Sequence, residues 1–148
     1  MVTADFVAYY AAERPGAIAF IDNGREVAFA ELDRDIARFA EALGEFGLPR
    51  GSVVAICCAD FYRHFLLIFA CERLALATAS FHGEAEVNAP IIAAAGLVLA
   101  DPETQVEGAK RVHFIDMAWL EGVLARGEVA RAGPPAYLPE DPIRIIRL

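Results

Sequence analysis

Residues 27–57 read VAFAELDRDIARFAEALGEFGLPRGSVVAIC, and this stretch decides the fold class. Apolar side chains recur in it at helical spacing, which predicts one long amphipathic helix. The predicted apolar stripe consists of Leu32, Ile36, Phe39, Ala40, Leu43 and Phe46. Gly47 and Pro49 are placed to end this helix. The run from Val53 to Cys57 is rich in β-branched and small residues and is typical of a strand covered on both faces.

The charged residues of the helix are predicted to lie on its solvent face. They are Glu31, Asp33, Arg34, Asp35, Arg38, Glu41 and Glu45. Asp33 and Asp35 could form an acidic pair for acid–base chemistry, but a solvated charged surface explains them better. The same interpretation applies to Glu84 and Glu86.

The other segments alternate between predicted strands and helices. Helices are predicted over 3–12 (capped by Thr3, with a stripe of Phe6, Val7 and Tyr10), over 61–74 (capped by Asp60), from Asn88 with Pro90 in the first turn, and over 117–125 (capped by Asp116). Strands are predicted over 17–21 and 25–29, joined by the Asn23-Gly24 turn, and over 77–80, 97–100, 112–115 and 143–148. This order predicts an α/β fold of three layers, a largely parallel sheet flanked by helices, with an N-terminal β-hairpin.

The chain length is that of one domain, 1–148, in which the proline-rich segment 131–142 is an extended connector to the last strand. A net charge of −8, with Lys110 as the sole lysine, argues against binding to nucleic acid or an anionic membrane. The longest apolar run, 65–71, is too short to cross a bilayer. An early Asp5 and the lack of a basic N-terminal region argue against a signal peptide, so a cytoplasmic location is expected.

Several motifs occur in the order and spacing of one known family. They are Pro15–Phe20, the Asn23-Gly24 turn, Ala28–Leu32, Leu43–Leu48 and Gly51–Ala55, followed more loosely by Leu97–Asp101 and Asp141–Ile146. The chain thereby resembles the N-terminal subdomain of the adenylate-forming superfamily, which includes acyl-CoA synthetases, aryl-CoA ligases, luciferases and peptide-synthetase adenylation domains. Each motif is degenerate, so their order carries the resemblance.

The sequence departs from the family pattern at several places. Ala28 stands where the family has a threonine that caps the long helix, and Ser52 stands where it has an aspartate. In the family, the strand matching 143–148 leads into a Ser/Thr/Gly-rich loop with a lysine that wraps the ATP phosphates. The sequence ends at Leu148, before such a loop, so the hypothesis is an N-terminal piece that lacks the reactive machinery.

The resemblance implies a function for the intact parent. Such a parent would be an AMP-forming acid–CoA ligase that activates a carboxylic acid with ATP and Mg, then passes the acyl group to a thiol such as CoA. This chain is expected to hold no cofactor and to be inactive alone, so whether it is an enzyme in its own right stays open. The implied partners are the remainder of the ligase or a second copy of the chain, as a homodimer.

One loop is a candidate CoA contact by resemblance. Phe81, His82 and Gly83 match the loop that lies near the nucleotide end of CoA in acyl-CoA synthetases. An aromatic ring for stacking and a glycine for close backbone approach fit that role, whereas the neighbouring acidic residues would repel a phosphate. An ordinary surface loop is the alternative.

No other motif carries chemistry. Neither common phosphate-binding fingerprint occurs, and neither Ser52 nor Ser80 lies in a nucleophile elbow. His64, His82 and His113 are isolated in the sequence and are interpreted as surface or satisfied histidines, with no metal or catalytic residue predicted. The thiols of Cys57, Cys58 and Cys71 are interpreted as reduced core residues.

Two other function classes stay open. The chain could be a non-catalytic interaction or scaffold module from a truncated paralogue, whose C-terminal strand pairs with a partner or with itself. A small flavodoxin-like enzyme is the weakest alternative, because no convergent polar cluster is evident in the sequence.

Overall fold

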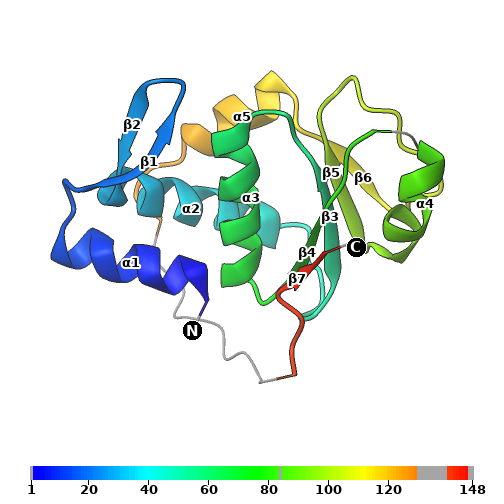
Figure 1. The fold of residues 1–148 in the computed structure, drawn as a ribbon, viewed down its shortest axis with the longest axis horizontal. Helices are drawn as coiled ribbons and strands as arrows, with labels where there is room; N and C mark the ends of the chain where they lie inside the picture. The colour runs from blue at the N-terminus through cyan, green and yellow to red at the C-terminus, as the bar shows by residue number, and fades with distance from the viewer. Residues whose placement is uncertain (1, 84, 130–139, 147–148) are drawn as a thin grey trace.

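The computed structural model describes residues 2–83, 85–129 and 140–146, and Figure 1 shows the path of the chain through them. The helices are α1 (Thr3–Glu13), α2 (Phe29–Gly44), α3 (Phe61–Arg73), α4 (Ala85–Ala94) and α5 (Met117–Leu124). The strands are β1 (Ile18–Asp22), β2 (Arg25–Ala28), β3 (Val53–Cys57), β4 (Ala77–Ser80), β5 (Leu97–Ala100), β6 (Val112–Phe114) and β7 (Arg144–Ile145). Within this described part, no helix has the length and apolar character of a membrane span.

The strands form two sheets, and together they confirm the predicted α/β class. Five strands pair in the order β6-β5-β3-β4-β7, and each neighbouring pair is parallel. Strands β1 and β2 form a separate antiparallel hairpin. Its turn uses Asn23 (φ 50°) and Gly24 (φ 79°), the left-handed conformation that an Asn-Gly turn favours.

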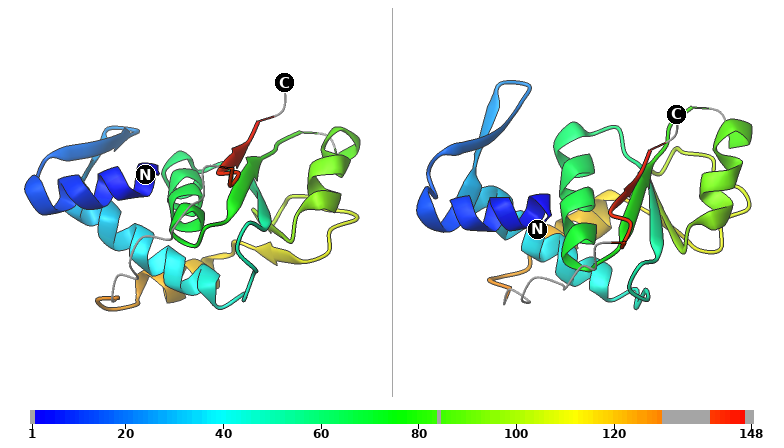
Figure 2. Two further views of the ribbon diagram at one scale, coloured as in Figure 1. Left: turned by 90° about the horizontal axis from the view of Figure 1, so that it is seen from below. Right: turned by 60° about the horizontal axis from the view of Figure 1, so that its bottom comes forward.

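Strand β3 lies in the middle of the large sheet and buries both of its faces. Val54 and Ile56 point into a core formed with α2, α3 and α5, whereas Ala55 points into a smaller core that includes Ile92 of α4. Figure 2 shows α3 and α4 on opposite sides of the sheet. The alternation along one strand therefore produces the three predicted layers.

Two predicted helix starts are confirmed by their caps. The Asp60 carboxylate accepts a hydrogen bond of 2.8 Å from the Arg63 backbone N–H at the start of α3. Asp116 accepts an equivalent bond of 2.8 Å from the Trp119 backbone N–H at the start of α5. Each side chain satisfies an N–H group that the helix itself leaves unpaired.

The prediction for α1 is wrong in its cap and in its buried face. The N-cap residue is Val2, and Thr3 already belongs to the helix. The buried Glu72 carboxylate of α3 accepts a 2.9 Å hydrogen bond from the Ala4 backbone N–H, so a tertiary contact replaces the expected local cap. Phe6 and Tyr10 are exposed, because the small Ala4 and Ala11 flank Val7 on the face packed against α2 and α3.

The prediction for α4 is also wrong at its start. The helix begins at Ala85, which places Asn88 and Pro90 inside it rather than at its cap and first turn. The Asn88 side-chain amide instead donates a 2.9 Å hydrogen bond to the His82 carbonyl oxygen. Most of the predicted connector 131–142 lies outside the described residues, as does Glu84.

Asp33 and Asp35 are not on a solvated surface. They are 2% and 6% exposed, because α2 packs against α1 and α3 on this side as well. Asp33 forms an ion pair with Arg73 of α3, and Asp35 accepts a 3.1 Å hydrogen bond from the Tyr62 hydroxyl. Burial raises the pKa of Asp35. Both carboxylates join α2 to α3 rather than forming an acid–base pair.

The N-terminus of α2 lacks a side-chain cap, and this absence yields a stability prediction. Ala28 has the extended backbone of an N-cap residue (φ −76°, ψ 157°), and Glu31 occupies the third helical position. We expect Ala28→Thr to raise the free energy of unfolding by about 0.5–2 kcal/mol, because the hydroxyl can accept a hydrogen bond from a free backbone N–H. Urea unfolding followed by Trp119 fluorescence measures the change. Ala28→Val, which has the same shape without the hydroxyl, is the control, and equal stability of the two variants would contradict the prediction.

Candidate functional site

The topology places a crevice at the carboxyl ends of β3 and β5, where the strand order reverses. The chain leaves β3 toward β4 through α3 on one face of the sheet, and it leaves β5 toward β6 through a loop whose Val106 and Ala109 pack in the smaller core on the other face. In open parallel sheets, ligands bind where the connections diverge in this way.

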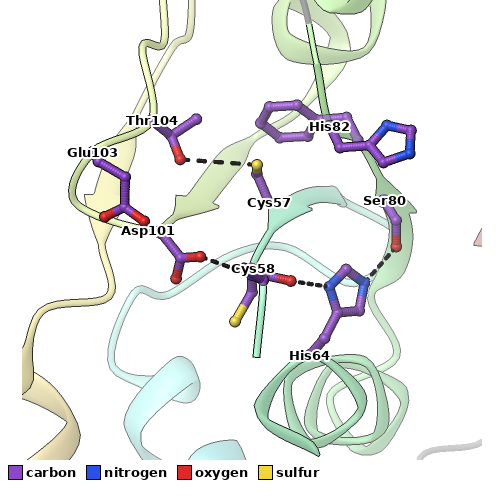
Figure 3. A pocket seen from close by; sticks show the side chains of 10 residues that line it. Cys57, Cys58, His64, Ser80, His82, Asp101, Glu103 and Thr104 are labelled. Atoms are coloured by element: carbon purple, nitrogen blue, oxygen red, sulfur yellow. Dashed lines mark hydrogen bonds between the residues drawn. The ribbon is translucent and has the colours of Figure 1, made fainter. Parts of the chain in front are cut away.

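A cavity of about 560 Å³ occupies this crevice. It is lined by residues at the carboxyl ends of three neighbouring strands, together with one residue of α3 (Figure 3). These lining residues are Cys57, Cys58 and Ala59 at the end of β3, Ser80, Phe81 and His82 at the end of β4, Asp101, Glu103 and Thr104 after β5, and His64 of α3. The lining thus carries hydroxyl, thiol, imidazole and carboxylate groups.

His64 joins two of these strand ends by hydrogen bonds through both ring nitrogens. Its Nδ1 lies 3.0 Å from the Cys58 carbonyl oxygen, and its Nε2 lies 2.7 Å from the Ser80 Oγ. A carbonyl oxygen can only accept, so Nδ1 carries the proton of the neutral ring. Nε2 is then an acceptor, and the Ser80 hydroxyl donates to it.

Arg144 of β7 completes this hydrogen-bond network. Its Nη2 donates to the Ser80 Oγ at 2.8 Å, and its Nη1 donates to the Thr78 Oγ1 at 3.3 Å. The pairing of β7 with β4, in which Arg144 lies beside Thr78, fixes this arrangement. The Ser80 oxygen therefore donates to an imidazole and accepts from a guanidinium.

The predicted loop Phe81–Gly83 lies at this crevice. Phe81 is 8% exposed and packs in the smaller core, whereas His82 is exposed at the rim. Gly83 has a φ of 82°, and a Cβ there would meet no atom within 4 Å, so its backbone is open to close approach. A contact of these three residues with CoA stays a prediction.

The cysteine thiols are poorly suited to be nucleophiles. Burial raises the pKa of Cys58 and of Cys71 to about 12, with nearby acidic groups adding to the effect. Burial also raises the pKa of Cys57, whose thiol lies 3.8 Å from the Thr104 hydroxyl. Because the thiolate is the reactive form, these thiols are held in their unreactive state.

The remaining candidates do not converge with this crevice. His113 packs edge-on against Phe46 and Trp119, and burial lowers its pKa. Lys110 is exposed in the loop before β6. In the described ranges, no group of three or more His, Cys, Asp and Glu side chains is arranged to hold a metal ion.

Comparison with protein families identifies the chain. A family model described as AMP-binding enzyme matches residues 7–83, just over half of the sequence. The chain belongs to the AMP-binding enzyme family. The match includes β3, α3, β4 and the loop Phe81–Gly83, and it stops before β5. No curated protein matches this family member in sequence.

Solved structures show the same fold in adenylate-forming enzymes. The N-terminal subdomain of NpsA from Klebsiella oxytoca has a TM-score of 0.79 and 19% identity, over 97% of this chain and 37% of that one. A fatty acyl CoA synthetase from Mycobacterium tuberculosis has a TM-score of 0.78 and 14% identity, over 95% of this chain and 31% of that one. O-succinylbenzoate coenzyme A synthetase (MenE) from Bacillus subtilis, in complex with AMP, has a TM-score of 0.70 and 18% identity, over 92% of this chain and 36% of that one. This family member thus spans about a third of the length of these relatives.

The raised thiol pKa values predict slow cysteine modification in the folded protein. At pH 8, DTNB should react with the native thiols at least about tenfold more slowly than with the chain in concentrated urea, because each unit of raised pKa removes about nine-tenths of the thiolate. Peptide mapping assigns the rates, and Cys71 should react last because it is fully buried. A native Cys58 that reacts as fast as in urea would contradict the assignment of an unreactive thiol.

Proposed function

We propose that this chain is the N-terminal part of an AMP-forming acid–CoA ligase of the acyl-CoA synthetase type. The parent would activate a carboxylic acid with Mg-ATP to an acyl-adenylate and transfer the acyl group to a thiol such as CoA, in the cytoplasm. The match of the family model to residues 7–83 carries this proposal. The likeness in fold to a fatty acyl CoA synthetase and to an O-succinylbenzoate coenzyme A synthetase supports it.

Within this proposal, the loop Phe81–Gly83 contributes to the CoA site. His82 is exposed and can reach a bound ligand, and the open backbone at Gly83 permits close approach. The buried Phe81 ring packs beneath them. Asp101 and Glu103 line the same cavity, so at the nucleotide end of CoA the loop is suited to the uncharged adenine base rather than to the phosphates.

The proposal assigns phosphate binding to the rest of the ligase, which gives a direct prediction for this chain. Isothermal titration calorimetry with Mg-ATP should show no binding tighter than roughly 1 mM, since the sequence contains neither common phosphate-binding fingerprint. Titration with CoA alone is the companion measurement, with His82→Ala as the variant that reports on the loop. Sub-millimolar binding of Mg-ATP would contradict the assignment of phosphate binding to the rest of the ligase.

The gene sequence beyond the codon for Leu148 separates the two leading functions. A Ser/Thr/Gly-rich loop with a lysine in the same reading frame would support the ligase. If it is present, the full product should exchange pyrophosphate into ATP when its carboxylic acid is supplied. A stop codon there would favour the second function.

That second candidate function is a non-catalytic interaction module, and the edge of the sheet favours it. Strand β7 lies at the end of the strand order, and Ile146 beside it is 72% exposed. An exposed apolar edge is a template for pairing with a second copy of the chain or with another protein.

If the edge pairs with a second copy, the mass measured by light scattering should rise with protein concentration toward that of a dimer. Ile146→Lys should restore a monomer, because a charge on the edge opposes strand pairing. Ile21→Lys is the matched control, since Ile21 is 62% exposed but lies on the separate hairpin. A monomer at every concentration would count against self-pairing.

A further inference from the structure

Ser80 and His64 are arranged as a nucleophile and its base. The Oγ–Nε2 distance is 2.7 Å, and the bond from Nδ1 to the Cys58 carbonyl fixes the tautomer in which Nε2 is free to take a proton. In hydrolytic serine sites a third group orients the imidazole in the same way, and here a backbone carbonyl serves.

Local structure holds both residues in place. His64 lies in the first turn of α3, whose start is fixed by the Asp60 cap, and its backbone N–H donates to the Asp60 carbonyl at 2.9 Å. Ser80 is the last residue of β4, paired in register with Ile56 of β3. Both side chains are half-buried at the crevice, so the hydroxyl is shielded without being sealed off.

Arg144 supplies positive charge at the same oxygen. Its Nη2 lies 2.8 Å from the Ser80 Oγ, and the Thr78 hydroxyl holds the other guanidinium nitrogen. A fixed cation at this distance stabilises negative charge that develops on the attacking oxygen or on a carbonyl oxygen beside it. Figure 3 shows the Ser80 hydroxyl directed toward His64 at the cavity.

Among the residues that the structure describes, the second serine and the cysteine thiols at the cavity lack this arrangement. The Ser52 hydroxyl donates to the Pro49 carbonyl at 2.6 Å, so its proton is held by a group that cannot accept it in a reaction. The thiols that line the same cavity are kept protonated by burial. Ser52 and Ser80 are the only serines in the sequence, which makes the distinction simple to test.

We propose that Ser80 is an acyl-accepting nucleophile, with His64 as its general base, toward activated esters and thioesters of carboxylic acids. The Ser80 Oγ forms a bond to the acyl carbon, its proton passes to His64 Nε2, and the bond from the acyl carbon to the leaving oxygen or sulfur breaks. The leaving group takes the proton from His64, or, where it departs as a stable anion, His64 releases that proton to solvent. Water then adds to the acyl-serine with His64 again as base, releasing the carboxylic acid and restoring the hydroxyl.

A fluorophosphonate probe tests the nucleophile on the unaltered chain. Attack forms an Oγ–P bond and expels fluoride, so the intact mass should rise by one probe adduct, and peptide mapping should place it on Ser80. Ser80→Ala should lose the adduct, whereas Ser52→Ala should keep it. An unlabelled chain, or an adduct confined to Ser52 or a tyrosine, overturns the proposal even if the Ser80 variant fails to fold.

A test of His64 as a general base needs a measurement that a purely structural histidine would not affect. His64→Ala should slow labelling of Ser80 by about 100-fold, the usual contribution of a general base. Added imidazole should restore part of that rate in His64→Ala and leave the Ser80→Ala variant unlabelled. Circular dichroism checks that the variants are folded. A folded His64→Ala chain that labels at the wild-type rate would refute the base assignment.

Hydrolysis of p-nitrophenyl acetate measures the full cycle. The chain should release p-nitrophenolate faster than Ser80→Ala does, and an acyl group on Ser80 should be detected by mass at early times. Equal rates for the two proteins would overturn the proposal. These results are independent of the ligase function, because neither ATP nor CoA enters the assay.

Discussion

The burial of β3 on both faces is the constraint on which the rest of the structure depends. A strand whose successive side chains all need cover must lie inside a sheet with helices above and below it. Here Val54 and Ile56 pack in the core on one face of the sheet, and Ala55 packs in the core on the other face. Strands β4 and β5 pair with β3 on either side. The chain continues from β3 to β4 on one side and from β5 to β6 on the other, with connections on opposite faces, and the crevice at the carboxyl ends of β3 and β5 follows from that reversal.

Much of the fold is encoded locally and is therefore visible in the sequence. The Asn23-Gly24 turn, the caps at Asp60 and Asp116, and the stripe of α2 each depend on residues close together in the chain. Signals of this kind predict the order of elements, and the order limits the topology to few choices. The parallel sheet and the hairpin could be predicted for that reason.

The predictions that were wrong share a different cause, which is contact between residues far apart in the sequence. Asp33 and Asp35 read as surface residues by their charge, but Arg73 and Tyr62 of α3 satisfy them in the interior. Glu72 likewise caps α1 from a distant helix, a role that a local pattern assigns to Thr3. The signal that was available is the presence of Glu72 and Arg73 together at the end of an otherwise apolar helix, since buried charges need partners.

The candidate site could not be predicted from local sequence patterns for the same reason. His64 and Ser80 are sixteen residues apart, and Arg144 lies a further sixty-four residues along the chain. Tertiary structure brings them together: Ser80 ends β4, His64 lies in the first turn of the helix that follows the neighbouring strand β3, and Arg144 lies beside Thr78 in the pairing of β7 with β4. A histidine in the first turn of a helix that follows a strand, and a serine that ends the next strand, form a pattern that could have been recognised once the sheet order was known.

The charged groups at the carboxyl ends of the strands decide which chemistry the described residues can support. Asp101 and Glu103 line the cavity, and the cation nearest the Ser80 oxygen, Arg144, already donates to two hydroxyl groups. A cluster that binds phosphates requires several donors or cations directed outward, whereas proton transfer and attack by a hydroxyl require one imidazole and one stabilised oxygen. The ligase proposal therefore places the phosphate groups outside these residues, and the serine proposal uses the part of the edge that remains. Both proposals use the polar groups at the carboxyl ends of the same strands. In the ligase proposal these groups position a ligand, and in the serine proposal they react with it.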